Sequence, residues 1–260
     1  MSERLSLTDD SLLAGHAENI QRFEFALEWC RGKRVLDAGC GSGYGAHFLG
    51  CNGAASVLGV DISAEAIDEA RREYQRDNVR FEVRDLQRLD AGPLNEPEVI
   101  VNFETLPHLA EPRKFLEAAR SQLAAGGTLI TSAPNGELVK TDEHGKPLYR
   151  YQHRTYSIEE FKSLLAACFS DVTLHAHWLT HQGRLRNLRA QELFAQLVEA
   201  YYNPLARAGR AIKRMAGRQS AGPPIFRGGA DSYAGDYALA PLASRAFPWP
   251  PTTLIAVCRI

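Results

Sequence analysis

The chain has 260 residues, 45% apolar and 23% charged, which is typical of a folded globular protein and excludes disordered, collagen-like and coiled-coil chains. Thirty basic and thirty-one acidic residues leave a net charge of −1, so global charge gives no argument for a nucleic-acid partner. No apolar run approaches the roughly 18 residues of a membrane-spanning helix, and the N-terminus lacks the pattern of a signal peptide. Five scattered cysteines without zinc-ligand spacing predict reduced thiols and a cytoplasmic location.

Strand and helix signals alternate along most of the chain. Apolar residues at helical spacing predict a helix within residues 9–30 that ends at Gly32. Short β-rich runs predict strands, and the amphipathic stretches between them predict helices, one of which Ser63 can cap. The predicted strands are residues 34–38, 56–61, 79–83, 99–103, 128–133, 172–177 and 253–259, and the later predicted helices are residues 65–75, 112–124 and 158–169.

This alternation predicts right-handed βαβ units, and therefore an α/β fold with a mostly parallel sheet and helices on both faces. We expect one domain over residues 1–260, with a helical and irregular insertion at 182–251 before the last strand. Residues 182–218 contain eight Arg or Lys and two Glu, at spacings that fit two helices. Residues 219–251 are rich in Gly, Pro, Ala and Ser and predict an irregular connection.

Four arginines of the basic segment fall on one side of a helix. One interpretation is a lid helix with a solvated basic face. The other is a surface for an anionic partner, either a phosphorylated or nucleotide-linked acceptor or anionic lipid headgroups. Gly209 and Gly217 weaken this helix, which argues against membrane insertion. The four residues are Arg207, Arg210, Arg214 and Arg218.

A glycine-rich loop follows the first predicted strand and allows a ligand to approach the backbone closely, with amide donors directed at it. Read as Gly41-x-Gly43-x-x-Ala46, the loop matches a dinucleotide fingerprint, but its first glycine then lies several residues beyond the strand. The alternative is Asp-x-Gly-x-Gly-x-Gly, which starts at Asp37 and includes Gly39. An acid at the strand end would repel a pyrophosphate and suits a ligand with an ammonium or sulfonium group.

Two further acids follow the second and third predicted strands. Asp61 lies twenty residues beyond Gly41, where a carboxylate can accept hydrogen bonds from the ribose hydroxyls of an adenosine. Asp85 could accept a bond from the adenine amino group. NAD enzymes and methyltransferases both use such acids, so they indicate a nucleoside rather than a reaction. The alternative for each acid is a helix cap or a solvated loop.

The segments GKRVLDAGCGSGYGAHFL, VLGVDISAEAIDEAR, VRFEVRDLQRL and VIVNFETLPHLAEPRKFLEAARSQLAAGGTLITSAPN occur in this order. Together they resemble class I S-adenosylmethionine-dependent methyltransferases, over residues 15–135. The resemblance is to a branch with Gly-Tyr-Gly in this loop, found in bacterial surface-polysaccharide and secondary-metabolite pathways. It implies a Rossmann-like, seven-stranded sheet with an antiparallel last strand. It also implies S-adenosylmethionine as the cofactor and S-adenosylhomocysteine as the product.

The resemblance implies roles for residues near the strand ends. The glycines would cradle the methionine part of the cofactor, and the acids would hold its ribose and adenine. The last two residues of the fourth predicted strand, Asn102 and Phe103, would line the floor under the sulfonium. Upstream, Arg22 would contact a carboxylate, while Phe23 replaces a common Tyr and lacks its hydroxyl. The implied cofactor-binding residues are Arg22, Asp37, Gly39, Gly41, Gly43, Asp61, Ile62, Asp85, Leu86, Asn102 and Phe103.

Three residues are candidates for the chemistry. Methyl transfer mainly requires alignment of the reactants, and a hydroxyl acceptor also requires a base. His108 follows the fourth strand and is kept where the family has Glu-His, but Pro107 replaces the acid. His153 lies where the family often has a His before a late helix, and Glu104 could be a base or a loop acid. For each residue the alternative is packing or a local hydrogen bond.

His175, His177 and His181 resemble a metal cluster, but strand alternation places the first two on one exposed face, so we expect no metal site. We therefore expect a methyltransferase with a small-molecule or glycan acceptor, and O-methylation rather than N-methylation. One alternative is a noncatalytic cofactor-binding or interaction protein of the same fold, which Pro107 keeps open. An NAD-type oxidoreductase is the other, but it requires the poorer glycine register.

Overall fold

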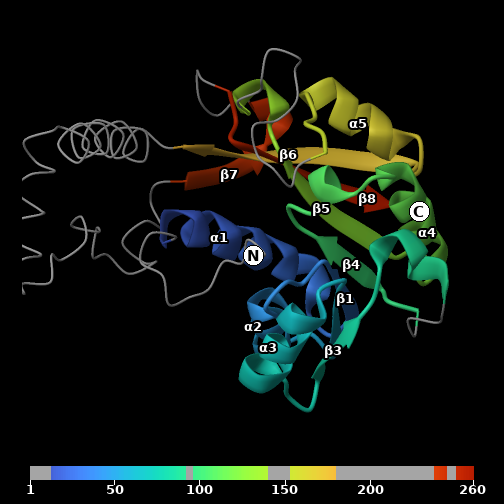
Figure 1. The fold of residues 1–260 in the computed structure, drawn as a ribbon. Helices are drawn as coiled ribbons and strands as arrows, with labels where there is room; N and C mark the ends of the chain where they lie inside the picture. Colours follow the sequence, from blue (N-terminus) through green and yellow to red (C-terminus); the bar gives the residue numbers. More distant parts are fainter. Residues whose placement is uncertain (1–12, 92–95, 140–152, 180–236, 245–249) are drawn as a thin grey trace, which may run out of the picture. The chain divides into compact units, whose positions relative to one another are not determined.

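The structure is a computed structural model that describes residues 13–91, 96–139, 153–179, 237–244 and 250–260 (Figure 1). Most of these residues belong to one compact unit, formed by residues 18–178 and 239–260. A second unit, residues 6–17 and 179–238, is largely outside the described residues. The basic segment 182–218 lies wholly outside them, so the expectation of an insertion within a single domain stays a prediction.

One sheet has the strand order β3-β2-β1-β4-β5-β8-β6-β7. The first five strands in this order are parallel, and β8 runs antiparallel to both β5 and β6. This confirms the predicted α/β fold with a mostly parallel sheet and an antiparallel strand from the end of the chain. The strands are β1 Arg34–Ala38, β2 Ser56–Asp61, β3 Val79–Val83, β4 Val99–Asn102, β5 Thr128–Pro134, β6 Asp171–Leu179, β7 Tyr237–Pro241 and β8 Thr253–Arg259.

Within the described residues, the sheet has eight strands where seven were expected. The additional strand, β7, lies within residues 219–251, for which an irregular connection was predicted, so that prediction is wrong at this point. The run Tyr-Ala-Leu-Ala-Pro has little β-propensity of its own, and pairing with β6 at the sheet edge outweighs it. A proline at the end of the run is compatible with an edge position.

Helices cover both faces of the sheet and create two cores. On one face α1, α2 and α3 pack against strand residues such as Val35 and Val57. On the other face α4 and α5 pack against Leu36 and Ile100. Neighbouring residues of one strand thus enter different cores, as expected for a sheet buried on both faces. The helices are α1 Leu13–Cys30, α2 Tyr44–Cys51, α3 Ala64–Tyr74, α4 Pro112–Gln122 and α5 Ile158–Ala166, with short 3₁₀ helices η2 Leu86–Ala91, η3 Leu106–His108, η4 Gly136–Leu138 and η6 Leu242–Ser244.

Local sequence signals explain several helix ends. Ser63 caps α3 as predicted, because its side chain accepts a hydrogen bond from the Ala66 amide at 3.3 Å. Ser157 and Glu160 form a reciprocal capping box at the start of α5. Gly32, with φ of 71°, follows the end of α1 in a conformation that favours glycine.

The strand order changes direction between β1 and β4, which are neighbours although β2 and β3 follow β1 in the chain. In open α/β sheets ligands bind beyond the carboxyl ends of the strands at such a switch point. The loops after β1, β2, β3 and β4 meet at this edge, and all the predicted cofactor-binding residues except Arg22 lie on the strand ends or in these loops.

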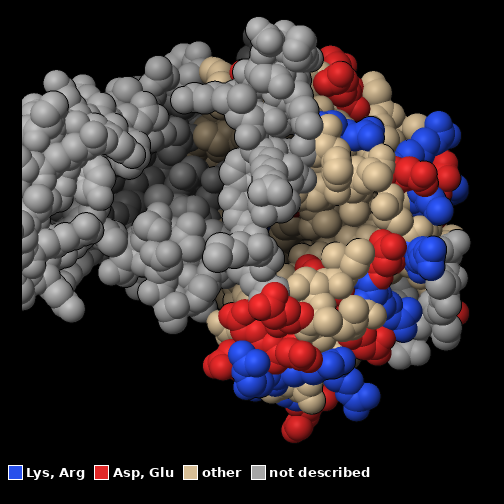
Figure 2. Space-filling view, in the orientation of Figure 1, with Lys and Arg blue, Asp and Glu red and all other residues tan. Residues whose placement is uncertain are grey.

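Charged side chains of both signs gather over α3 on the face drawn in Figure 2. The sequence of α3 contains Glu65, Asp68 and Arg71, of which Asp68 and Arg71 form an ion pair at 3.6 Å. This mixture gives the described face near α3 no uniform basic character. A search of the described residues finds no helix that is long and apolar enough to cross a bilayer.

Candidate functional site

The glycine loop after β1 packs closely against neighbouring residues at two of its glycines. Gly39, Gly41 and Gly43 have φ values of 88°, 53° and 92°, which favour glycine. A Cβ on Gly39 would lie 2.4 Å from Thr105 Oγ1, and a Cβ on Gly43 would lie 2.7 Å from the Cβ of Ala70. At Gly41 a Cβ would meet no atom within 4 Å, so this glycine borders open space. Packing therefore requires two of the glycines, and Gly41 presents bare backbone to the outside.

The amides of the loop donate inward. Gly39 N and Cys40 N donate to Val60 O at 2.8 and 3.0 Å, and Gly41 N donates to Asp61 Oδ2 at 3.0 Å. The expectation that these amides would be directed at a ligand is therefore wrong for these three positions. A loop whose donors are already used is poorly suited to a pyrophosphate, which requires N–H groups.

Asp37 is the penultimate residue of β1, just before the loop, and is 3% exposed. Burial raises the pKa of its carboxyl group to about 7; the nearby charge of Asp61 adds to this rise, and a hydrogen bond from the Ala46 amide opposes it. Its Oδ2 atom is buried and has no hydrogen-bond partner among the described residues. A buried acceptor of this kind requires a donor, and a positively charged donor would also relieve the repulsion between the two acids.

Asp61 connects the loop to the start of α3. Its Oδ1 accepts from Ser63 N at 2.9 Å while its Oδ2 holds the Gly41 amide. The capping alternative is therefore present, but a carboxylate has about four lone-pair sites, so further hydrogen bonds remain possible. Ile62 follows at once and is 69% exposed, and Val83 at the end of β3 is 47% exposed. Both acid and apolar surface are thus available for a nucleoside at this edge.

Asp85 and Leu86 lie in the next loop and are held by the protein itself. Asp85 Oδ1 accepts from Gln87 N at 2.9 Å and so caps the turn of η2. Leu86 is 5% exposed and packs in the core beneath α4. A contact of Leu86 with a ligand is thus limited to its backbone. The predicted contact of Asp85 with the adenine amino group and the predicted cofactor-binding role of Leu86 stay predictions.

Asn102 is the last residue of β4, and Phe103 follows it. Asn102 is completely buried; its Nδ2 donates to Ala38 O at 2.6 Å and its Oδ1 accepts from Thr131 Oγ1 at 3.1 Å. The side-chain amide therefore joins β1, β4 and β5. Phe103 packs edge-on against Phe23, with ring centroids 5.0 Å apart. Hydrogen bonds hold the Asn102 side chain and ring packing holds Phe103, and their place under the sulfonium stays a prediction.

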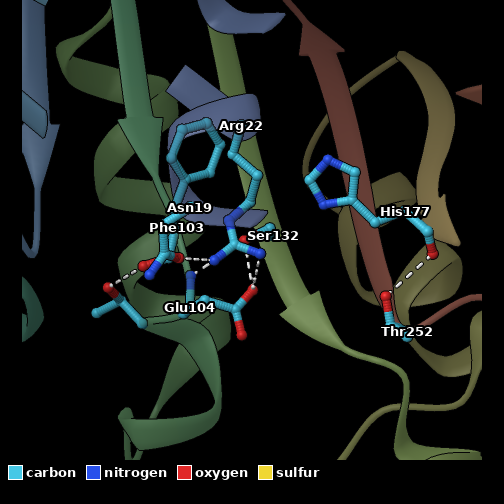
Figure 3. Close-up of polar contacts among 8 residues, drawn as sticks. Asn19, Arg22, Phe103, Glu104, Ser132, His177 and Thr252 are labelled. Atoms are coloured by element: carbon cyan, nitrogen blue, oxygen red, sulfur yellow. Dashed lines mark hydrogen bonds and ion pairs between the residues drawn. The ribbon is translucent and has the colours of Figure 1, made fainter. Parts of the chain in front are cut away.

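Glu104 follows directly and has the central place in a polar cluster (Figure 3). Its Oε1 accepts from Ser132 Oγ at 2.7 Å, and its backbone amide donates to the same hydroxyl oxygen at 3.1 Å. Arg22 Nη1 lies 3.7 Å from Oε1. Glu104 has a φ of 55°, which is uncommon for a residue with a side chain and is found at functional sites. Three elements, α1, β4 and β5, thus fix one carboxylate at the switch point.

Arg22 is 4% exposed on α1 and also donates to Asn19 Oδ1, one turn earlier. The resemblance implied that Arg22 contacts a carboxylate, and within the protein this carboxylate is Glu104. Contact with a cofactor carboxylate stays a prediction. Phe23 fills space beside the loop, because a Cβ on Gly45 would lie 2.0 Å from its ring.

His108 and His153 come together at the same edge. His108 is exposed at the end of η3, and the exposed His153 donates its backbone N–H to Pro107 O at 2.8 Å. Arg154 Nη2 reinforces this junction with a hydrogen bond to Ala110 O at 2.9 Å. The segment before α5 is thus joined to the loop after β4. The structure brings the two histidines into one region, and their chemical roles stay predictions.

The expectation of an exposed histidine face on β6 is wrong. His177 is completely buried, and its backbone carbonyl accepts from Thr252 Oγ1 at 3.2 Å. His175 packs against the ring of Phe25 with centroids 4.9 Å apart, so the face is covered rather than solvated. His181 lies outside the described residues. Within the described ranges, no three His, Cys, Asp or Glu side chains are grouped as a metal site would require.

Sequence reasoning missed the residues that position Glu104 and the loop. Ser132 lies in a segment that was predicted only as a strand, and Asn19 lies in a helix that was predicted only from its apolar residues. Thr105 lies against Gly39 on the other side of the loop. Ser132 is polar at a strand position that is fully buried, and a polar residue within an otherwise apolar strand is the signal that could have identified it.

These residues fit S-adenosylmethionine. The orphaned Oδ2 of Asp37 suits an ammonium donor, and the open side of Gly41 permits close approach. Asp61 suits ribose hydroxyls, and the exposed Ile62 suits an adenine ring. A dinucleotide fits less well, because the loop directs its amides inward beside two acids.

Comparison with known proteins agrees with this geometry. The chain matches the family model described as Methyltransferase domain over residues 30–199. A probable S-adenosylmethionine-dependent methyltransferase of Mycobacterium tuberculosis is 32% identical over 164 residues, which are 62% of this chain and 57% of the relative. A ubiquinone biosynthesis O-methyltransferase of Coxiella burnetii is 33% identical over 107 residues, 40% of this chain and 45% of the relative. The chain thus spans about half the length of these curated relatives.

Solved structures support the fold. A SAM-dependent methyltransferase from Archaeoglobus fulgidus superposes with a TM-score of 0.57, over 95% of this chain and 94% of that chain. The sequence identity is 14%, so this likeness concerns the architecture.

Proposed function

Because this chain belongs to the methyltransferase domain family, we propose that it transfers a methyl group from S-adenosylmethionine to a hydroxyl group of a small-molecule or glycan acceptor. The observation that carries this proposal is the pair of acids, Asp37 and Asp61, beside a glycine loop whose amides donate inward. This arrangement favours a cationic nucleoside over a phosphate-bearing one.

Asp37 would accept from the ammonium group of the cofactor, Asp61 would bind the ribose, and Ile62 would cover the adenine. The ionised form of Asp37 is favoured once a cation lies beside it, because the cation opposes both burial and the charge of Asp61. S-adenosylmethionine, when bound, supplies a methyl group that its positive sulfur has activated. The protein's main task is then to align the acceptor, which can contribute roughly 7–11 kcal/mol of barrier lowering.

Glu104 is the base in this proposal. Ser132 donates a hydrogen bond to its Oε1, and the guanidinium of Arg22 lies 3.7 Å from the same oxygen. Its Oε2 receives no hydrogen bond from a described residue, which leaves this oxygen to take the proton of the acceptor hydroxyl. The side chain is 32% exposed, so an acceptor can reach it. His108 and His153 lie on the rim formed by the loops after β4 and before α5, where they would contact the acceptor.

The chemical class of the acceptor is inferred from the sequence alone. The basic segment 182–218 favours a phosphorylated or nucleotide-linked molecule, and the resemblance to the Gly-Tyr-Gly branch favours a surface-polysaccharide or secondary-metabolite pathway in the cytoplasm. The name of the Coxiella relative supports O-methylation. If the arginines bind phosphate, Arg210→Glu with Arg214→Glu should raise the acceptor's KM, and added salt should weaken the effect because charges are screened over about 10 Å at 0.1 M.

The test uses the full chain with methyl-labelled S-adenosylmethionine and a panel of hydroxylated, amine-bearing and phosphorylated acceptors. The proposal expects label in an oxygen-linked methyl group of at least one acceptor, and loss of this transfer in Glu104→Gln. Transfer only to nitrogen would overturn the O-methylation proposal. Tight binding of S-adenosylhomocysteine with no transfer to any acceptor would favour the noncatalytic alternative that Pro107 suggests.

A further inference from the structure

A second chemically distinctive cluster lies at the end of α2. Cys51, the last residue of this helix, is exposed, and its Sγ lies 3.3 Å from Nε2 of His47, one turn earlier. Arg76, in the turn between α3 and β3, donates a hydrogen bond from Nη1 to the same sulfur. A thiol, an imidazole and a guanidinium thus meet at one surface point.

The imidazole is oriented by the backbone. His47 Nδ1 lies 3.1 Å from the carbonyl oxygen of Tyr74, and its ring packs against the Tyr74 ring with centroids 5.3 Å apart. A carbonyl oxygen can only accept, so Nδ1 carries the proton and Nε2 of the neutral ring is the acceptor. The nitrogen beside Cys51 Sγ is therefore the one that can take the thiol proton.

Two positively charged groups would then lie beside the sulfur. Proton transfer to Nε2 creates an imidazolium beside the sulfur, and the guanidinium of Arg76 is always charged. A nucleophile, a base in hydrogen-bond contact and a third group that orients the base form the usual arrangement of an activated nucleophile. Here these parts are Cys51, His47 and the Tyr74 carbonyl.

The other four cysteines provide a contrast within the same chain. All four are buried. Burial raises the pKa of the Cys30 and Cys258 thiols to about 12, and it also raises those of Cys40 and Cys168. These thiols are at most 7% exposed and their raised pKa values keep them protonated, so we expect them to react slowly.

The cluster lies apart from the methyl-transfer site. The helix α2 begins beside the glycine loop at Tyr44 and reaches Cys51 about 12 Å further along its axis, towards the opposite edge of the sheet. None of the residues assigned to the cofactor or the acceptor belongs to it. Its chemistry is therefore independent of the proposed methyl transfer.

We propose that Cys51 is a reactive thiol and a modification site for anionic low-molecular-weight disulfides. His47 Nε2 takes the thiol proton, and Cys51 Sγ attacks one sulfur of the disulfide. A new S–S bond forms while the original one breaks, and the second sulfur leaves as a thiolate that takes the proton from His47. Cys51 is oxidised to the mixed disulfide and the leaving half is reduced to a thiol. Arg76 favours reagents that carry carboxylates, because guanidinium and carboxylate groups pair well.

The experiment uses the native full chain and dithiobis(nitrobenzoate), an anionic disulfide whose leaving thiolate is coloured. One equivalent should react, about tenfold faster than a free cysteine peptide at the same pH, and peptide mapping should place the adduct on Cys51. Cys51→Ser should abolish this phase, whereas the control Cys168→Ser should retain it. His47→Gln should slow it about tenfold.

Comparison with neutral dithiodipyridine isolates the role of Arg76. Arg76→Gln should slow the anionic reagent more than the neutral one, and Arg76→Lys should restore most of the difference. The inference is overturned if wild-type mapping finds the adduct on another cysteine. It is also overturned if Cys51 reacts no faster than the free peptide, or if His47→Gln leaves the rate unchanged in a chain with wild-type melting behaviour.

Discussion

The proposed site has a cofactor side, the loops after β1, β2 and β3, and an acceptor side, the region around Glu104 after β4 and Ser132 on β5. On the cofactor side the acids bond to backbone amides, as Asp61 does with Ser63 N and Gly41 N. On the acceptor side a single carboxylate, Glu104, is held by side chains from two other elements, Arg22 on α1 and Ser132 on β5. The backbone thus shapes one side, and side chains assemble the other.

This difference predicts a separation of effects. Changes on the cofactor side should alter binding of S-adenosylhomocysteine, because the loop geometry depends on them. Changes on the acceptor side should alter turnover while leaving that binding intact. Each prediction below either sharpens or breaks this separation.

Glu104→Gln should have the largest effect. It keeps the shape of the side chain and an oxygen for Ser132 but removes the base, so kcat should fall roughly 10²–10⁴-fold. The affinity for S-adenosylhomocysteine should remain unchanged in calorimetry. Glu111→Gln, an exposed acid before α4, is the matched control and should behave as wild type. A large loss of cofactor affinity in Glu104→Gln would break the separation.

Asp61→Ala should have the next largest effect, on affinity. Loss of two charge-assisted hydrogen bonds to ribose, each worth roughly 1.5–3 kcal/mol, should weaken S-adenosylhomocysteine at least about tenfold. The variant also loses the tether to Gly41 and Ser63, so its melting temperature should fall. The affinity of Asp61→Asn, which keeps one acceptor oxygen, should lie between those of the wild type and Asp61→Ala. Asp68→Ala on the exposed face of α3 is the control. If Asp61→Ala bound S-adenosylhomocysteine with wild-type affinity, the role of Asp61 would be limited to capping the turn at Ser63.

Asp37 should make stability depend on pH. Its pKa of about 7 in the folded chain lies above the usual value of 3.8, so the folded chain holds a proton that the unfolded chain has released. Stability should therefore fall as pH rises from about 4 to about 7, by at most about 1.4 kcal/mol per pH unit from this group. Asp37→Asn should remove this slope in urea unfolding at pH 5 and pH 8. If Asp37→Asn had the same slope as the wild type, Asp37 would be ionised over this whole pH range.

Ser132→Ala should have the smallest effect and tests positioning. Loss of the hydrogen bond to Oε1 should cost about 1 kcal/mol, or roughly fivefold in kcat, without a change in cofactor affinity. A role in the protein fold alone would lower stability but leave the pH profile of kcat in place, whereas a positioning role should shift that profile. Ser121→Ala removes a similar hydrogen bond on α4 and is the control.

The same comparison explains what the sequence could and could not predict. The strands β1, β2 and β3 and the cap at Ser63 were predicted at their observed bounds, because hydrophobic runs and capping residues are local signals. The family match confirms the expected methyltransferase family and its cofactor. The inward direction of the loop amides was not predicted, because it depends on contact with Val60 and Asp61 from another strand.

The acceptor side was less predictable for the same reason. Glu104 was named as a candidate, but its partners Ser132 and Arg22 meet it only through the folded sheet and α1. Likewise β7 forms because β6 offers an edge, and His177 is buried although its neighbours suggested an exposed strand face. Tertiary contacts outweigh local propensity at these positions.

The central claim is that two acids and an inward-bonded glycine loop select a cationic nucleoside. Calorimetric titration of the full chain with S-adenosylhomocysteine and, separately, with NADH tests it most directly. We expect saturable binding of S-adenosylhomocysteine, which at 100 times its Kd should stabilise the fold by roughly 2.7 kcal/mol, and no comparable binding of NADH. Saturable binding of NADH together with no binding of S-adenosylhomocysteine would contradict the account.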